Sequence, residues 1–292
     1  MVTSVLITGA TGYIGAHVVK ELYRHVNTRE VYIEALDIDT SNRNYIAKYC
    51  HILTEDDVRN FKRTGMVYDV VIHLAGLVQV GESMEKPYEY YDTNLNGTIN
   101  ILKNVKCKHF IFASTAGAFD PVSPYAKSKV AAEDVIRQLA PGYTIFRFFN
   151  VAGSNGEHRQ YGPSTHLIRV AAEAAAGKRK GVTINGGDYP TRDGTCVRDY
   201  IHVVDLAKAI VNAALSNPKN AKYECLGSNK GFTNLEVLDI MKEVTGKSWI
   251  EDFGPRREGD PAVLQIDGTS EYLEIKRNIV DMCRSAYEME LK

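Results

Sequence analysis

Several features of specialised proteins are missing from this 292-residue sequence. It contains no apolar run of 18 residues, so no segment is predicted to cross a membrane. Its formal net charge of -1 provides no excess of basic side chains for the phosphates of a nucleic acid. The five cysteines are odd in number and far apart, which excludes a disulfide framework or a zinc site. With no signal-type segment at its start, the sequence predicts a cytoplasmic globular protein with reduced cysteines and no metal, membrane or nucleic-acid partner.

In the first half of the chain, apolar runs of strand length alternate with segments of helical spacing. The strands are expected at residues 2–8, 31–36, 70–74, 109–114 and 143–148. The helices are expected at residues 15–25, 87–104 and 124–139. This alternation predicts an α/β fold in which residues 1–150 form a Rossmann-type, doubly wound parallel sheet.

After Asn150 the pattern changes to loops rich in glycine and proline. Helical spacing returns near residues 165–177, 205–216 and 234–245, with short strands expected between them. We therefore expect residues 151–292 to form a smaller, mixed α/β substrate-binding lobe. Some of its elements are expected to return to the first domain.

A glycine-rich turn, Gly9-Ala10-Thr11-Gly12-Tyr13-Ile14-Gly15, joins the first expected strand to the first helix. Glycines at these positions let the backbone approach a pyrophosphate, which the N–H groups at the start of a helix attract. The turn therefore predicts a dinucleotide site. Asp37 ends the second strand, where a carboxylate accepts hydrogen bonds from the adenosine ribose and repels a 2′-phosphate, so NAD is favoured over NADP. In the alternative interpretation, Asp37 or Asp39 only caps a turn.

Tyr125 and Lys129 stand four residues apart on a helix expected to begin at Pro124, so both side chains lie on one face. A lysine cation about 5–6 Å from the phenol, at an effective dielectric constant of ~20, is worth roughly 3 kcal/mol, or about two pKa units. This effect predicts that Tyr125 acts as a base near neutral pH. Thr115, at the end of the preceding strand, is expected to bind the same reacting oxygen.

Longer motifs make the chain resemble, nearly end to end, the UDP-glucose 4-epimerase family of the extended short-chain dehydrogenase/reductase type. The motifs are His73-Leu74-Ala75-Gly76-Leu77, Val80-Gly81-Glu82-Ser83, Tyr90-Tyr91-Asp92-Thr93-Asn94, Arg147-Phe148-Phe149-Asn150-Val151-Ala152-Gly153, Thr165-His166-Leu167, Asp188-Tyr189-Pro190-Thr191, Asp193-Gly194-Thr195, Arg198-Asp199-Tyr200-Ile201-His202-Val203 and Arg256-Arg257-Glu258-Gly259-Asp260. Chance does not produce all of these in order.

The resemblance implies an NAD-dependent isomerase that epimerises C4 of a UDP-hexose, UDP-glucose or UDP-galactose, through a transient 4-keto sugar with Tyr125 as the base. It also implies a homodimer. The residues that it assigns to NAD are Gly9, Gly12, Tyr13, Ile14, Gly15, Asp37, Leu74, Ala75, Gly76, Asn94, Tyr125, Lys129 and Phe149. The residues that it assigns to the UDP-hexose are Thr115, Asn150, His166, Leu167, Thr183, Asn185, Arg198, Arg257, Asp260 and Leu264.

The two arginines in the second set also fit on physical grounds. A diphosphate needs fixed cations, and the guanidinium groups of Arg198 and Arg257 can bind it in a bidentate manner. Their alternative role is in surface salt bridges. The histidines His73, His166 and His202 adjoin apolar runs, so we expect packing or hydrogen bonding from them rather than catalysis.

The sequence departs from the family's pattern in four places. The connection at residues 119–123 is shorter than in the family, which opens one rim of the expected site. Val78 replaces a lysine near the cofactor, and Asn185 replaces an aromatic residue near the uracil. His51 takes roughly the position of an acidic residue that reads the adenine.

Three other functions are considered beside this one. A sugar-nucleotide 4,6-dehydratase carries an Asp-Glu pair after the Ser/Thr at the strand end, whereas Thr115 is followed by Ala116-Gly117. A UDP-N-acetylhexosamine 4-epimerase stays open, because Leu264 is intermediate in size between the tyrosine that restricts the family's pocket and the small residues that admit an N-acetyl group. A non-catalytic NAD sensor or scaffold is disfavoured, because the Thr, Tyr and Lys expected for catalysis are all present.

Overall fold

The computed structural model describes residues 3–26, 30–39, 43–160, 162, 165–216, 220–257, 259–268 and 270–292. Val2 of the first expected strand and Glu258 of an expected substrate motif lie outside these residues. The chain forms two compact units, Met1–Arg147 with Ala207–Glu224 and Phe148–Leu206 with Cys225–Lys292. Within the described residues, no helix has both the length and the apolar character needed to cross a membrane.

The strands are short, and most of the longer ones lie in the first half of the chain. They are β1 (Thr3–Thr8), β2 (Val31–Asp37), β3 (Ile52–Glu55), β4 (Val67–His73), β5 (Lys106–Thr115), β6 (Tyr143–Phe148), β7 (Asn150–Ala152), β8 (Gly181–Asn185), β9 (Val197–His202), β10 (Lys222–Leu226), β11 (Gly231–Thr233), β12 (Ile250–Gly254) and β13 (Val263–Leu264).

The helices include two short 3₁₀ segments, η1 and η3, and one π-helical segment, η2. In chain order they are α1 (Tyr13–Tyr23), α3 (Arg43–Ile46), η1 (Ala47–Tyr49), α4 (Val80–Glu85), α5 (Pro87–Tyr91), η2 (Asp92–Asn96), α6 (Gly97–Asn104), η3 (Ala116–Phe119), α7 (Pro124–Leu139), α8 (Leu167–Ala175), α9 (Val203–Leu215), α10 (Asn234–Thr245) and α11 (Ile279–Glu290).

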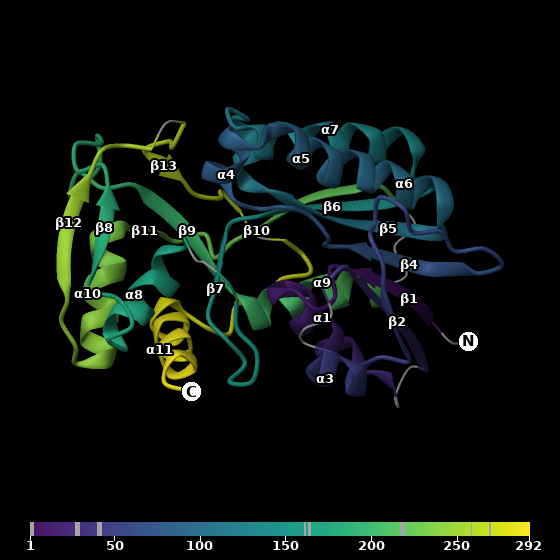
Figure 1. Cartoon of the computed structure of the whole chain (residues 1–292), viewed down its shortest axis with the longest axis horizontal. Coiled ribbons are helices and arrows are strands. Elements are labelled where there is room, and N and C mark those ends of the chain that lie inside the picture. The colour runs from purple at the N-terminus through teal and green to yellow at the C-terminus, as the bar shows by residue number, and fades with distance from the viewer. Residues whose placement is uncertain are drawn as a thin grey trace. The chain divides into compact units, whose positions relative to one another are not determined.

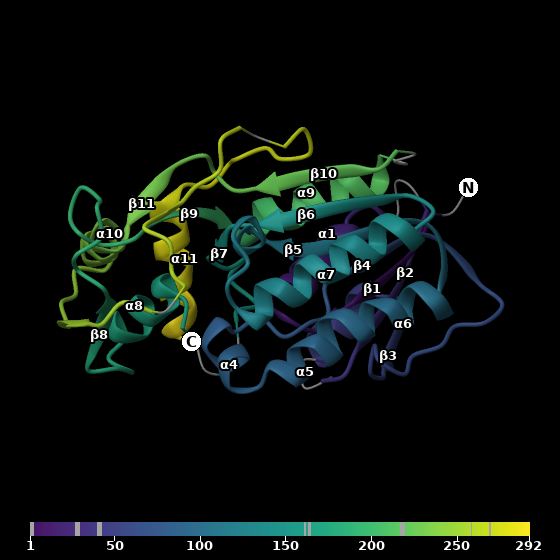
Figure 2. The ribbon, with the colours of Figure 1, turned by 90° about the horizontal axis from the view of Figure 1, so that it is seen from above.

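A seven-stranded sheet forms the centre of the first unit, in the order β10-β6-β5-β4-β1-β2-β3. The pairs β1–β2, β1–β4, β2–β3 and β4–β5 are parallel. In Figures 1 and 2, α5, α6 and α7 cover one face of this sheet, while α1 and α9 cover the other. This arrangement confirms the predicted Rossmann-type, doubly wound fold, in which ligands bind at the carboxyl ends of the strands.

The apolar faces of these elements account for the core of the first unit. Leu6, Leu36, Val71, Phe110 and Phe112 belong to one buried cluster, and each comes from a strand of the sheet. Strands buried on both faces are read as continuous apolar runs, which is why the sequence predicts them well.

Helix α7 shows how local sequence sets an element that carries site residues. The Ser123 hydroxyl caps its first turn by accepting a 3.2 Å hydrogen bond from the Ala126 amide. Pro124 occupies the first turn, where a missing N–H costs nothing. The helix ends at Leu139, as predicted, and Tyr125 and Lys129 lie in its first two turns.

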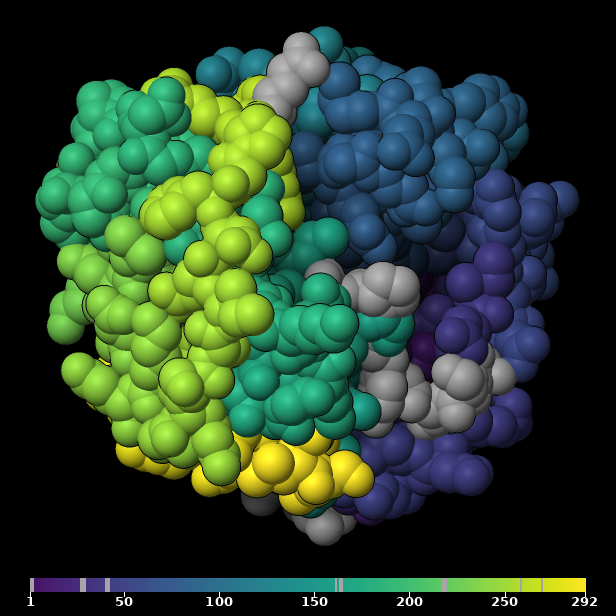
Figure 3. All heavy atoms as spheres, turned by 60° about the vertical axis from the view of Figure 1, so that its left-hand side comes forward, coloured from purple at the N-terminus to yellow at the C-terminus, as the bar shows by residue number. Residues whose placement is uncertain are grey.

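The second unit is mixed α/β, as expected. Strand β9 pairs with β7, β11 and β13, and β8 pairs with β12. Helices α8, α10 and α11 pack on one another around buried residues such as Ile168, Met241 and Met282. In Figure 3, the yellow-green residues at the left of the view belong to this unit, and the yellow C-terminal residues contribute its lower edge.

Some expectations about the elements were wrong. The continuous helix expected at residues 87–104 is divided into α5, η2 and α6. Helices α4 and α11 and strand β3 were not expected. A capping box at the start of α11, in which Asn278 and Asp281 exchange side-chain and backbone hydrogen bonds, is a signal that could have identified it.

Candidate active site

The glycine turn after β1 is held by close backbone contacts. Gly9 has a φ of +69°, and a Cβ atom there would lie 2.7 Å from the amide nitrogen of Ala75. A Cβ atom on Gly15 would lie 2.0 Å from the carbonyl oxygen of Gly9. Gly12 is the N-cap of α1 and provides no side-chain cap, and Tyr13 and Ile14 begin the helix. The turn is therefore suited to an anion bound by backbone N–H groups.

Asp37 lies beside this turn. One carboxylate oxygen accepts a 2.9 Å hydrogen bond from the amide of Thr11, and the other accepts a 3.3 Å bond from the amide of Asp39. The second bond is the local turn contact of the alternative interpretation. The first joins the carboxylate to the glycine turn, and each oxygen still has a lone pair for a ribose hydroxyl.

Asn94 holds the segment that follows β4, which contains Leu74, Ala75 and Gly76. Its amide oxygen accepts a 2.8 Å bond from the Leu77 amide, and its amide nitrogen donates to the Leu77 carbonyl (3.1 Å) and to the Ser128 hydroxyl (3.0 Å). A Cβ atom on Gly76 would lie 2.7 Å from the Asn94 amide oxygen, so glycine is needed there. Asn94 thereby joins this segment to α7 from within the π-helical turn, a kind of distortion frequent at functional sites.

His73 is buried and connects β1, β4 and the start of α6. Nδ1 lies 2.7 Å from the Thr8 hydroxyl and Nε2 lies 3.1 Å from the Thr98 hydroxyl. Burial, followed by the charge of Lys129, lowers the pKa of His73 to about 3. It is neutral at physiological pH, in agreement with the expected packing role.

The three residues predicted to be catalytic are brought together in the first unit. The Tyr125 phenol is hydrogen-bonded with the side chain of Thr115. The Lys129 ammonium group donates a 2.9 Å bond to the Ala113 carbonyl and lies 4.8 Å from the centre of the Phe112 ring. Lys129 is 3% exposed, and burial lowers its pKa to about 8.

The pKa of Tyr125 differs from the sequence-based expectation. Desolvation by the surrounding protein raises it, and the hydrogen bond with Thr115 only partly opposes this effect. The predicted net lowering of the Tyr125 pKa is therefore wrong. The reason is burial, which is the largest cause of the raised pKa and which the spacing of two side chains does not reveal.

In the second unit, several residues assigned to the UDP-hexose form a connected group. Arg198 is 8% exposed, and its guanidinium lies 3.3 Å from the Asp260 carboxylate. The Asp260 amide donates a 3.2 Å bond to the Arg257 carbonyl. Arg257 donates from Nε and Nη2 to the amide oxygen of Asn185, each over 3.1 Å, in the amide orientation that this contact favours. Leu264 of β13 stands beside Arg198 of β9 in a parallel pair.

The other assigned residues of this unit lie on nearby elements. Asn150, in β7, is paired with Tyr200 of β9 and hydrogen-bonded with its phenol. Phe149 is buried, and its amide donates to the Leu226 carbonyl over 3.1 Å. His166 is the N-cap of α8, which begins at Leu167, and it is within electrostatic reach of Arg257. Thr183 is exposed in β8, two residues before Asn185.

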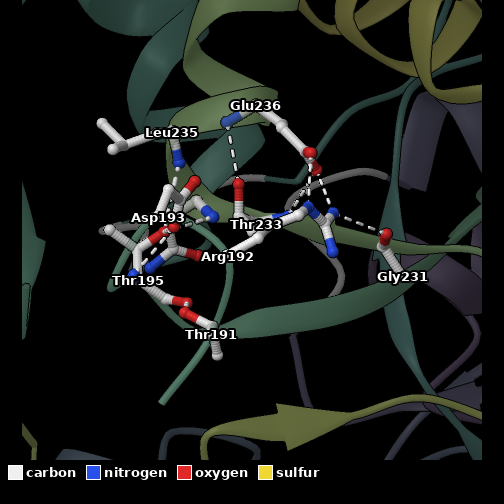
Figure 4. A network of polar contacts seen from close by, with 9 residues as sticks. Thr191, Arg192, Asp193, Thr195, Gly231, Thr233, Leu235 and Glu236 are labelled. Carbon is white, nitrogen blue, oxygen red and sulfur yellow. Dashed lines mark hydrogen bonds and ion pairs between the residues drawn. The ribbon is translucent and has the colours of Figure 1, made fainter. Parts of the chain in front are cut away.

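Figure 4 shows how the turn before β9 is secured. The Thr195 hydroxyl donates to the Asp193 carboxylate (2.8 Å) and accepts from the Asn234 amide at the start of α10 (3.1 Å). Arg192 donates from Nε to the Glu236 carboxylate (2.6 Å) and from Nη2 to the Gly231 carbonyl (3.1 Å). The Asp193-Gly194-Thr195 motif therefore has a structural role, because it holds β9, the strand that carries Arg198, in place.

The expectation for His51 was wrong. His51 precedes β3, and its Nδ1 accepts a hydrogen bond from the Ile33 amide over 3.1 Å. The β2–β3 register places Glu55 beside Asp37, and the Asp56 amide donates to the Asp37 carbonyl over 3.0 Å. Acidic residues at the end of β3, rather than His51, lie at the edge where the adenosine is expected. The register of the two strands decides this, and the sequence did not reveal it.

A buried network that was not predicted lies one turn after Lys129. Glu133 is fully buried and receives hydrogen bonds from Ser114, Arg147 and Tyr223.

Among the described residues, no group of three or more His, Cys, Asp or Glu side chains could hold a metal ion.

Comparisons with known proteins agree with this geometry. A model of the NAD dependent epimerase/dehydratase family matches residues 5–225. The chain is 34% identical to a UDP-glucose 4-epimerase of Lacticaseibacillus casei, over 89% of this chain and 87% of that protein. It is similar in structure to UDP-glucose 4-epimerase from Bifidobacterium longum in complex with NAD+ and UDP (TM-score 0.87, 30% identity, 99% and 98% of the chains). It is also similar to the UDP-Glc/GlcNAc 4-epimerase from Campylobacter jejuni (TM-score 0.79, 32% identity, 99% of each chain).

Proposed function

The chain belongs to the NAD dependent epimerase/dehydratase family, and we propose that it is an isomerase that interconverts UDP-glucose and UDP-galactose by NAD-dependent epimerisation at C4. The observation that carries this proposal is the arrangement of Thr115, Tyr125 and Lys129 at the end of β5 and the start of α7. We assign NAD and the catalytic groups to the first unit and the nucleotide of the substrate to the second.

The residues of the first unit fit NAD. The glycine turn provides the uncapped start of α1 for the pyrophosphate, and a Cβ atom on Gly9 or Gly15 would close this turn. The Asp37 carboxylate, held by the Thr11 amide, is suited to the ribose hydroxyls of the adenosine. Lys129 uses one of its three N–H groups on the Ala113 carbonyl and has others for the second ribose.

Tyr125 takes the proton from the sugar 4-hydroxyl in this mechanism, and Thr115 hydrogen-bonds the same oxygen. When bound, NAD supplies the two-electron acceptor for oxidation to a 4-keto sugar and the positive charge of its nicotinamide ring. Because desolvation raises the pKa of Tyr125, the phenol needs positive charge around it to lose its proton near neutral pH. Lys129 provides part of that charge. When C4 is reduced again from its opposite face, Tyr125 returns the proton to the oxygen on C4.

The second unit binds the UDP part of the substrate in this proposal. Arg198 and Arg257 supply the cations for the diphosphate, since guanidinium groups bind phosphate oxygens in a bidentate manner. Arg198 is held by Asp260, and Arg257 by Asn185, so both are oriented before the substrate arrives. Fixing the nucleotide in this way leaves the hexose free to turn as the 4-keto sugar, which is the step that inverts C4.

A UDP-N-acetylhexosamine 4-epimerase is the second candidate. It is favoured by Leu264, which is smaller than the tyrosine expected in an enzyme restricted to plain hexoses, and by the similarity to the Campylobacter jejuni UDP-Glc/GlcNAc 4-epimerase. A dehydratase is disfavoured, because Thr115 caps η3, which begins with the small residues Ala116 and Gly117.

One incubation tests the function. The purified protein, with its NAD content measured, is incubated separately with UDP-glucose, UDP-galactose and their N-acetyl forms, and the products are separated and identified. We expect interconversion of the plain pair as the faster reaction. A protein with intact bound NAD and no interconversion of either pair would refute an epimerase, and a 4-keto-6-deoxy sugar would establish a dehydratase instead.

We also propose a homodimer that works in the cytoplasm. Apolar side chains exposed on α4 and α5, those of Val80, Met84 and Tyr88, support an interface there, because they are 46%, 53% and 75% exposed. The five cysteines form no disulfide with one another, which suits a reducing compartment. Light scattering should give about twice the 32.5 kDa of one chain, and a monomer at micromolar concentration would contradict the dimer.

A further inference from the structure

The end of β5 and the first turns of α7 are joined at the catalytic residues themselves. Lys129 donates to the carbonyl of Ala113, and Tyr125 is hydrogen-bonded with Thr115, two residues further along the strand. These two contacts join the first two turns of α7 to the end of β5. A third contact joins the residue between them, Ser114, to the next turn of α7.

That third contact centres on the carboxylate of Glu133, which is 0% exposed. The Ser114 hydroxyl donates to Oε1 over 2.5 Å. Arg147 donates from Nε to Oε1 (3.0 Å) and from Nη2 to Oε2 (2.8 Å), and the Tyr223 hydroxyl donates to Oε2 (2.9 Å). Each oxygen therefore receives two hydrogen bonds, and the donors come from β5, β6 and β10. A buried carboxylate with this number of donors is fixed in place.

The partner of Glu133 is itself held rigidly. The Arg147 guanidinium lies 4.7 Å from the centre of the Phe119 ring and 4.7 Å from that of the Tyr223 ring. Phe119 belongs to η3, the segment that Thr115 caps. The ion pair therefore contacts β10 through Tyr223 and the segment that Thr115 caps through Phe119.

We propose that Glu133 is a positioning residue for the epimerase reaction: its carboxylate holds α7 in register on β5, and its negative charge supports the ammonium group of Lys129 one helical turn away. The inference rests on the proposed function, because that function gives Lys129 and Tyr125 their roles. Glu133 acts through these residues and through Ser114, and it has no contact with substrate in this proposal.

The charges around Lys129 explain why a carboxylate is needed at this position. Burial lowers the pKa of Lys129 to about 8, and the charge of Glu133 raises it against that effect. The titratable groups that face Lys129 are Tyr125 and Glu133 on α7 and His73 on β4, and His73 is neutral near physiological pH. Glu133 in turn faces Arg147 on β6 and Tyr223 on β10. Glu133 therefore opposes the loss of the Lys129 proton that burial favours.

The test compares Glu133→Gln, which keeps the shape and removes the charge, with Glu133→Asp, which keeps the charge and shortens the side chain. The NAD dissociation constant and the turnover of the holoenzyme are measured from pH 6 to pH 9.5. For Glu133→Gln, we expect the pH at which NAD affinity and kcat fall to decrease by about one unit, with roughly a tenfold loss of kcat at pH 8.5. Glu133→Asp should lose kcat by a similar factor at every pH and keep the wild-type midpoint.

The matched control is Asp134→Asn, which removes the same charge from the next residue of α7. Asp134 is exposed and pairs with Arg137 over 2.5 Å, so its substitution should leave the midpoint and kcat unchanged. If Glu133→Gln leaves the buried charge of Arg147 without its carboxylate and does not fold, the double variant Glu133→Gln/Arg147→Gln removes both charges and is measured in the same way.

The outcomes separate this inference from the proposed function. A Glu133→Gln or double variant that is less stable, but has the wild-type pH midpoint for NAD binding, overturns the positioning role and leaves only a structural one. NAD binding is measured without a UDP-sugar. A wild-type protein that fails to epimerise therefore refutes the proposed function, but not the shift in the pH midpoint of NAD binding that we expect for Glu133→Gln. If the wild type turns over UDP-glucose and the pH midpoint of the variants does not shift, only the role proposed for Glu133 is refuted.

Discussion

The ammonium nitrogen of Lys129 lies 2.9 Å from the carbonyl oxygen of Ala113, and this bond holds a buried cation at the end of β5. Burial lowers the pKa of Lys129 to about 8, well below its value in an unfolded chain, so the folded protein binds this proton less tightly than the unfolded chain. The contribution of Lys129 to stability is therefore present above the unfolded pKa of about 10.4 and is lost as pH falls to about 8. A catalytic cation at this position is obtained at a cost in stability.

This cost leads to a prediction for Lys129→Met. At pH 7 the variant should have a free energy of unfolding higher by about 1–2 kcal/mol without NAD, because it no longer buries a charge. It should also bind NAD more weakly and lose most of its turnover. Urea unfolding and NAD titration measure the two effects. Lys127→Met, at an exposed position of the same helix, should change neither, and an unchanged NAD affinity in Lys129→Met would contradict the assignment.

Tyr125→Phe removes one hydroxyl and little volume, so folding and NAD binding should stay close to those of the wild type. Turnover should fall by about 10²- to 10⁴-fold, the usual value of general acid–base catalysis. Steady-state kinetics with UDP-galactose measure the loss. Tyr88→Phe, at a residue 75% exposed on α5, is the matched control and should be fully active. Retention of more than about a tenth of the activity by Tyr125→Phe would count against Tyr125 as the base.

Asp37→Ala should reduce the preference for NAD over NADP, because it removes both a ribose acceptor and a charge that repels a 2′-phosphate. Asp37→Asn keeps an acceptor for the Thr11 amide without the charge, so it separates the two effects. Binding of both cofactors to the wild type and both variants is the measurement. If the wild type binds NADP as tightly as NAD, Asp37 serves only the turn around Asp39.

The sequence predicts the central sheet well because its parallel strands are buried apolar runs separated by helices of regular spacing. It predicts the Tyr125–Lys129 pair for a similar reason, since four residues are about one helical turn. The features that the sequence does not predict depend on contacts between residues that are far apart in the chain. The break in the helix at residues 92–96 accompanies the contacts that Asn94 makes with Leu77 and Ser128.

The same reasoning explains the errors at the site. The raised pKa of Tyr125 depends on how much protein surrounds its phenol, which no local pattern records. The place of His51 depends on the register of β3 on β2, where a difference of a few residues decides which side chains reach the strand ends. The partners of Glu133 come from three different strands, so helical spacing identifies only the residue and not its contacts.

Acid should destabilise the protein through three buried histidines. Burial lowers the pKa values of His73 and His202 to about 3 and that of His109 to about 4. The unfolded chain takes up these protons near pH 6.5 and the folded chain does not, so the stability that the neutral rings provide is present above about pH 6.5 and is lost as pH falls. Each histidine should contribute up to ~1.4 kcal/mol per pH unit.

Urea unfolding between pH 7.5 and pH 5 measures this dependence. His202→Gln removes one of the three groups, so the free energy of unfolding of the variant should decrease less steeply with acid than that of the wild type. Equal slopes for the two proteins would show that His202 is not among the groups responsible.

Substrate range should depend on Leu264, which the β9–β13 register places beside Arg198. A leucine is shorter than a tyrosine, so we expect the plain hexoses to be preferred and the N-acetyl sugars to react more slowly. A hydrophobic wall discriminates by ~1–3 kcal/mol, which limits the preference from this residue to roughly 10- to 200-fold. Leu264→Tyr should move the ratio of kcat/KM toward plain hexoses, and Leu264→Ser should move it toward N-acetyl sugars. Val263, its exposed strand neighbour, points to the opposite face, so Val263→Ser should leave the ratio unchanged. If neither substitution of Leu264 changes the ratio, this side chain does not line the sugar pocket.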